Sequence, residues 1–218
     1  MRDDSEIWDE FKWEEFMKEQ DKKLDRYMEL FYRYQDDPNR DEIIAREMGW
    51  TWLLENGEKD ARDEEVNEFP DEDAEGEEWK ARSGLQEDDK FDGFRDTPVY
   101  LRAKAFAHTA MKFADSLPED KRGDSSVVDF LSNAMVAAAK IAGGSGIGYD
   151  IEELGGNIAY CKRGLHAANY ALAALREMNE KRIITEDSYA ELLVPLTEVR
   201  NMIAVHVLDL REQFRKGI

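Results

Sequence analysis

The stretch IEELGGNIAYCKRGLHAANYALAAL, residues 151–175, carries the most regular pattern in the chain. Its apolar residues recur at alternating intervals of three and four for more than three heptads, which is typical of a helix along the seam of a bundle. The seam positions are Ile151, Leu154, Ile158, Cys161, Leu165, Ala168, Leu172 and Leu175. We therefore predict a long helix that begins at Asp150 and packs on other helices.

Two helices are predicted before this one. Thr97 followed by Pro98 has the form of a helix start, an N-cap residue and then a proline in the first turn. Pro118 ends this helix, and the next one begins at Asp124 or Ser125. Its apolar face contains Val127, Leu131, Ala134, Ala138 and Ile141.

A fourth helix is predicted after Thr185, running to about Phe214, with a kink at Pro195 because proline removes one backbone hydrogen bond. Four helices joined by short loops, with no credible strand, predict an all-α fold. We expect residues 98–218 to form an up-and-down four-helix bundle.

The glycine-rich stretch KIAGGSGIG, residues 140–148, raises the question of a phosphate-binding loop. The glycine spacing does not fit a dinucleotide fingerprint, and no Gly-Lys-Ser/Thr follows it. We expect these glycines to end one helix in a left-handed cap and to reverse the chain. Asp150 and Glu153 have the spacing of a capping box for the next helix.

The N-terminal region is predicted to be helical as well. Residues 5–34 contain no glycine or proline and show helical periodicity, which indicates one long amphipathic helix capped by Asp4 or Ser5. A shorter helix is expected from Asp41 to Glu55. We interpret residues 1–57 as an acidic, Trp-rich helical hairpin that extends the bundle.

The acidic residues are concentrated in the part of the chain that precedes the predicted bundle. The formal net charge is −20, and residues 1–100 hold 34 acidic and 15 basic residues against 16 and 15 in the remainder. Residues 58–97 are mostly charged, and such a composition buries too little apolar surface to offset its ordering entropy. We predict an acidic linker or loosely draped segment there.

All five tryptophans lie within the first 100 residues. Because aromatic residues are enriched among interface hot spots, we expect the acidic N-terminal region to bind a basic protein partner. The residues predicted for this face are Trp8, Trp13, Phe31, Trp50 and Trp52. The alternative is that these aromatic side chains pack on one another or on the bundle.

Enzymatic chemistry finds little support in the sequence. His108, His166 and His206 lack the glutamate three residues earlier that a bundle di-iron site needs, and we expect partly buried histidines without a metal. Cys161 is the single cysteine and sits at a seam position, which indicates a small buried hydrophobe. We expect no catalytic residue, no metal and no cofactor.

The expected location is the cytoplasm, because the first ten residues lack the charge and apolar pattern of a signal peptide and no stretch reaches the length of a membrane span. Lys162, Arg163 and Arg200 are a candidate phosphate-binding patch for nucleic acid. The alternative is that these three residues belong to a solvated helix face with ion pairs.

The order of four segments resembles a known family. SLPEDKRG ends one helix, KIAGGSG ends the next, and GLHAANYALAALREM is followed by KRIITEDSYAELLVPLTEVRNMI. This arrangement, over residues 98–214, is similar to the four-helix bundle proteins encoded in intervening sequences of large ribosomal RNA genes, which include the accessory variability proteins of diversity-generating retroelements. Ala138 and Gly143 depart from that pattern, where the family usually has proline and glutamate.

The resemblance implies a homopentamer, and for the retroelement proteins it implies binding to a reverse transcriptase and to nucleic acid through a basic surface. We therefore expect a non-enzymatic, oligomeric accessory or scaffold protein that binds a protein partner through its acidic N-terminal region. The alternative is a nucleic-acid-binding accessory factor of a reverse transcriptase or a related enzyme.

Overall fold

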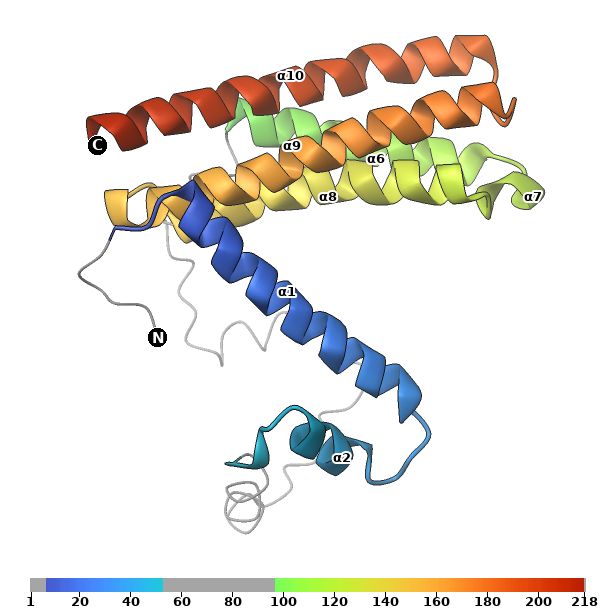
Figure 1. Ribbon diagram of the computed structural model, residues 1–218. Coiled ribbons are helices and arrows are strands. Elements are labelled where there is room, and N and C mark those ends of the chain that lie inside the picture. The colour runs from blue at the N-terminus through green and yellow to red at the C-terminus, as the bar shows by residue number, and fades with distance from the viewer. Residues whose placement is uncertain (1–6, 53–96, 218) are drawn as a thin grey trace, which may run out of the picture. The chain divides into compact units, whose positions relative to one another are not determined.

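The computed structural model describes residues 7–52 and 97–217, and every regular element in these two ranges is a helix (Figure 1). The predicted all-α class is confirmed. The helices are α1 (Glu10–Arg33), α2 (Arg40–Glu47), α6 (Pro98–Ser116), α7 (Glu119–Arg122), α8 (Ser125–Ile147), α9 (Ile151–Glu180) and α10 (Glu186–Lys216). The short helix α7 was not expected from the sequence.

The chain divides into two compact units, and the division falls inside α1. The large unit is Met1–Glu14 with Glu87–Ile218, and the small unit is Glu15–Gln86. The expected linker at residues 58–97 lies outside the described residues except for Thr97, which precedes α6.

Four long helices build the large unit. Helix α8 packs on α6 and α9, and α10 packs on the same two helices, so that each contacts two others (Figure 1). Seven of the eight α9 residues predicted for the seam are buried or packed against the common core, while Ile151, the first residue of the helix, is half-buried outside it. The largest side chains that are essentially inaccessible to solvent are Phe130, Ile141, Leu154, Ile158, Leu175, Met178, Leu196, Ile203 and Leu210.

Two of the predicted helix starts have their side-chain caps. Asp124 accepts a hydrogen bond from the backbone N–H of Ser126 at 2.9 Å, and Thr185 accepts one from Ser188 at 3.2 Å. Hydrogen bonds from the Ser126 hydroxyl, the Lys181 ammonium and the Ser126 N–H lower the pKa of Asp124 to about 2. Helix α10 continues through Pro195 to Lys216.

The prediction that the glycine stretch, residues 140–148, ends a helix was right for Gly148, the C-cap of α8, and wrong for Gly143 and Gly144. Helix α8 continues through Gly143 and Gly144 to Ile147 and stops before Gly148, whose φ is +134°. A Cβ on Gly144 would lie 2.7 Å from the Asn157 side chain, and one on Gly143 would lie 3.0 Å from the Tyr160 ring. These glycines therefore let α8 and α9 approach closely.

The predicted capping box is wrong too. Asp150 precedes α9, but its side chain makes no capping hydrogen bond. Its backbone carbonyl accepts from the N–H of Glu153 at 2.9 Å instead. The Asn157 side chain donates to the carbonyl of Gly148 at 2.9 Å, which fixes the turn between α8 and α9.

Helix α1 begins later than predicted. The Asp9 carboxylate accepts hydrogen bonds from the backbone N–H groups of Phe11 and Lys12 at 3.0 and 2.9 Å, so Asp9 is the cap. Residues 7–9 precede the helix, and the expected caps at Asp4 and Ser5 lie outside the described residues.

Helix α2 ends earlier than predicted, at Glu47 and not at Glu55. Gly49 takes a left-handed conformation with φ of +73°. Its N–H donates to the carbonyl of Arg46 at 3.1 Å, and the N–H of Trp50 donates to Ala45 at 2.7 Å. This pair of bonds is a Schellman motif, which closes the helix at the glycine.

Candidate functional site

The candidate site is the surface of α9 and α10 that binds the start of the chain through ion pairs and aromatic contacts. We call residues Trp8–Glu14 the N-terminal segment. Gly155 and Gly156 in the first two turns of α9 leave the space for it. A Cβ on Gly155 would lie 2.1 Å from the carbonyl oxygen of Trp8, and one on Gly156 would lie 3.0 Å from the Trp13 ring. The segment therefore rests directly on the helix backbone.

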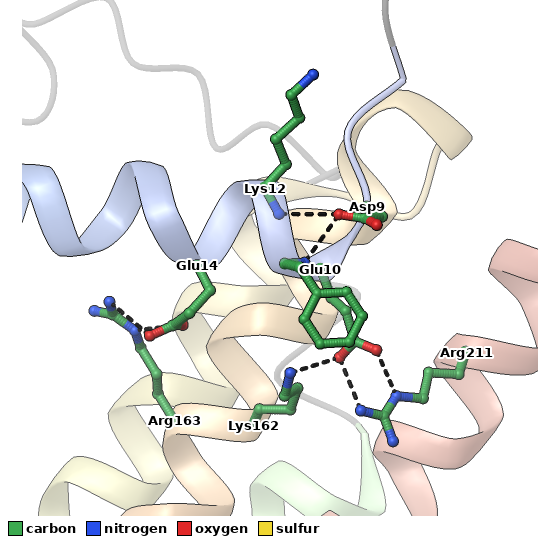
Figure 2. Close-up of polar contacts among 8 residues, drawn as sticks. Asp9, Glu10, Lys12, Glu14, Lys162, Arg163 and Arg211 are labelled. Carbon is green, nitrogen blue, oxygen red and sulfur yellow. Dashed lines mark hydrogen bonds and ion pairs between the residues drawn. The ribbon is translucent and has the colours of Figure 1, made fainter.

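Two carboxylates of the segment pair with cations of the large unit (Figure 2). The Glu10 carboxylate accepts two hydrogen bonds from the Arg211 guanidinium, each 2.9 Å long, and lies 2.9 Å from the Lys162 ammonium. The Glu14 carboxylate accepts from Arg163 at 3.0 and 3.3 Å. Paired donors on a guanidinium fix the orientation of a carboxylate, so these contacts define the register of the segment.

Aromatic contacts complete the site. The Trp8 and Trp13 rings meet edge to face with centroids 5.7 Å apart. The Lys162 ammonium lies 4.8 Å from the centre of the Phe11 ring, while 66% of Phe11 itself is exposed. A groove of about 490 Å³ runs beside the segment. Its lining residues are Asp9, Glu10, Phe11, Ile158, Leu208, Arg211, Phe214 and Arg215.

The cations control the ionisation of Glu10. Burial raises the pKa of this carboxyl, but the hydrogen bonds and charges of Arg211 and Lys162 outweigh burial and hold the pKa below the ordinary value of 4.5. The Glu10 side chain is only 12% exposed, so solvent screens these pairs less than it screens a surface ion pair.

This pKa direction predicts how attachment of the segment depends on pH. A lowered folded pKa means that the Glu10 contacts stabilise the attached segment fully above pH 4.5 and are lost as the pH falls through the folded pKa. Tryptophan fluorescence of wild type and Glu10→Gln should report this loss. The difference in attachment free energy between the two proteins should stay constant above pH 4.5 and shrink below it; a difference independent of pH would contradict the pairing.

The five aromatic residues predicted for partner binding have separate environments. Trp8 and Trp13 are half-buried on the large unit, as the packing alternative expected. In the small unit, the Trp50 ring stacks on Tyr27 at 5.9 Å, and the Arg40 guanidinium lies 4.8 Å from the Phe31 ring. Trp52 is 59% exposed.

The three cations predicted for nucleic acid all have bonding partners within the chain. Lys162 and Arg163 pair with Glu10 and Glu14, as described above. Arg200 donates to the side-chain carbonyls of Asn169 and Asn201, each at 3.1 Å.

Glu10, Glu14 and Arg211 were not predicted as partners from the sequence. A signal was present, because Glu10 and Glu14 are four residues apart and therefore share one face of α1. The adjacent Gly155 and Gly156 were a second signal. Two glycines inside a predicted helix indicate close approach of another chain segment.

Within residues 7–52 and 97–217 no group of three metal-ligating side chains comes together. His108 and His166 are exposed, so the expectation that they are partly buried was wrong; His206 is half-buried, and burial lowers its pKa. Cys161 is buried as predicted, and burial raises its pKa to about 12.

Comparison with known proteins was negative at every level. The chain matches no protein-family model, no curated protein and no solved structure.

Proposed function

We propose that this chain is a non-catalytic interaction protein. In this proposal the large unit is an up-and-down four-helix bundle that self-associates as a scaffold, and the acidic helical extension binds a basic protein. The support for the bundle is the packing of α8 and α10 on both α6 and α9 around one core.

The observation that carries partner binding is the exposure of large apolar side chains on the small unit. Leu24, Tyr32 and Trp52 are 59%, 64% and 59% exposed. Residues 15–52 hold ten acidic and seven basic side chains, so these apolar groups stand in an acidic surrounding. Aromatic anchors with a charged rim suit a partner of opposite charge, because the rim steers the encounter and the anchors supply the contact.

Trp8 and Trp13 have a different role in this proposal. Since both rings already pack within the large unit, we assign them to holding the N-terminal segment and assign partner binding to Tyr32 and Trp52. By the resemblance to intervening-sequence proteins, a reverse transcriptase or another nucleic-acid enzyme is the first partner to test.

The test is quantitative capture by the full-length protein. Wild type, Tyr32→Ala/Trp52→Ala and a control variant, Val194→Ala on α10, would be used to isolate partners from native cells, and the recovered proteins would be compared. We expect a basic partner that wild type and the control retain and the double variant loses. We also expect its binding to weaken with salt, because rim charges are screened.

Equal recovery by all three proteins would contradict the assignment of binding to the small unit. Salt-independent binding would contradict the basic partner. Val194 is 70% exposed on the large unit, so its substitution controls for the general loss of surface apolar area.

A further inference from the structure

Helix α8 presents an apolar face that the described residues, 7–52 and 97–217, leave uncovered. Val128 and Met135 are each 50% exposed, and Val136 is 39% exposed. The exposed positions continue along one stripe of the helix: Ser125, Val128, Asp129, Ser132, Met135, Val136, Ala139 and Gly146. The opposite face of α8 packs on α6 and α9. Large apolar side chains exposed along one stripe of a helix are suited to a partner surface.

Helix α8 carries two charged residues of opposite sign on one side of the helix. Asp129 and Lys140 are the only charged residues of α8, in a chain of which 37% is charged. They are eleven residues apart, which is three helical turns, so both lie on one side of the helix about 17 Å apart. Neither makes an ion pair within the described ranges; the Lys140 ammonium lies 4.9 Å from the centre of the Tyr160 ring.

We propose that this face pairs with α8 of a second copy of the chain, in antiparallel orientation about a two-fold axis. The inference rests on the self-association included in the proposed function and names its surface. In an antiparallel pair centred near Met135, Asp129 of one copy lies opposite Lys140 of the other, and the reverse contact repeats across the axis. Met135 and Val136 of both copies then meet at the centre.

The face is self-complementary, which argues for a second copy over an unrelated partner. An interface about a two-fold axis requires each surface to match itself, and one acid six residues before Met135 with one base five residues after it meets that condition. Small residues recur at every seventh position, at Ser125, Ser132, Ala139 and Gly146, so two helices can approach closely. A groove of about 190 Å³ between α6 and α8, lined by Met111 and Met135 among others, leaves space next to the paired α8 helices for side chains of the second copy.

This pairing closes with two copies. A cyclic pentamer, which the family resemblance implies, instead needs two different surfaces on each copy. The α8 face therefore predicts a species of twice the 25.3 kDa chain mass.

Charge reversal in the full-length protein tests the geometry. Asp129→Lys places two lysines opposite each other at both ends, and Lys140→Glu places two carboxylates there. Each single variant should raise the dimer dissociation constant at least about tenfold, because like charges in contact cost several kcal/mol. The double variant Asp129→Lys/Lys140→Glu should restore the dimer, and a mixture of the two single variants should form the mixed dimer.

Sedimentation equilibrium of each protein gives the masses, with Val136→Glu as an apolar-centre variant and Val194→Glu as the matched control on another face. Val136→Glu should give monomers and Val194→Glu should not. A wild-type monomer would overturn both the proposed self-association and this inference. An oligomer insensitive to the α8 variants, or one that the double variant fails to restore, would overturn this inference and leave self-association standing.

Discussion

Replacing Gly155 with alanine should detach the N-terminal segment from the large unit while the helices of that unit stay folded. The new Cβ would lie 2.1 Å from the carbonyl oxygen of Trp8 and 2.9 Å from the carbonyl carbon of Asp9. Both neighbours are backbone atoms, so a side-chain rotation cannot relieve the overlap. The segment must move away from α9.

The substitution should weaken the attachment of the N-terminal segment and should not destabilise helix α9. Alanine favours an isolated helix over glycine by about 1 kcal/mol, so α9 itself is not weakened. Detachment exposes two tryptophan side chains and separates Glu10 from Arg211 and Lys162. By comparison with truncation of large aromatic side chains, we expect the substitution to cost about 2–4 kcal/mol of attachment free energy.

The chain offers a direct measurement of this effect. The five tryptophans all lie before residue 80, so their fluorescence reports the N-terminal region, while far-ultraviolet circular dichroism is dominated by the long helices. Gly155→Ala should shift the emission of Trp8 and Trp13 to the red at pH 7 and leave the helical signal in place. An unchanged emission spectrum would contradict the placement of the segment on α9.

Gly123→Ala is the matched control. Nothing lies within 4 Å of a Cβ on Gly123, and its φ of −82° suits any residue. This variant should leave fluorescence unchanged and alter stability little, with any change in the stabilising direction through the unfolded chain. A red shift in the control would mean that glycine substitution in general, and not the contact with Trp8, causes the effect.

Local rules in the sequence were sufficient to predict the four long helices of the large unit, though not the short helix α7. The heptad spacing of α9 predicts its buried face, and Asp124, Thr185 and Pro98 mark helix starts that the structure confirms. These signals act within a few residues, so one sequence suffices to recognise them. Gly143 and Gly144 misled the prediction because a glycine that ends a helix and one that admits a neighbouring helix look the same in sequence.

The N-terminal site could not be predicted in the same way. Helical periodicity shows that Trp13 belongs to an apolar face but not what covers that face. The pairing of Glu10 with Arg211 joins residues about 200 positions apart, and charge alone offers each carboxylate many partners. Two features together reduce the number of possible partners for these carboxylates. The first is the four-residue spacing of the two carboxylates on α1. The second is the pair of adjacent glycines on α9, which lies seven residues before the Lys162–Arg163 pair.

Replacing Phe130 with alanine should produce the largest loss of stability in the large unit. The Phe130 side chain is 0% exposed, and its ring meets Phe106 edge to face with centroids 6.2 Å apart. Truncating a fully buried phenylalanine leaves a cavity between α6 and α8 and costs about 3–5 kcal/mol. In a unit of this size we expect the melting temperature to fall by roughly 6–20 °C.

The matched control is Val194→Ala, which removes an apolar group that is 70% exposed and should change the free energy of unfolding by less than about 0.5 kcal/mol. Phe130→Ala should move the melting curves by circular dichroism and by tryptophan fluorescence together, because Trp8 and Trp13 lose their support when α9 unfolds. Gly155→Ala should change fluorescence alone. A Phe130→Ala variant that melts like wild type would show that the ring is outside a packed core. One that melts early while the fluorescence transition stays in place would show that the N-terminal segment does not depend on α9 for its attachment.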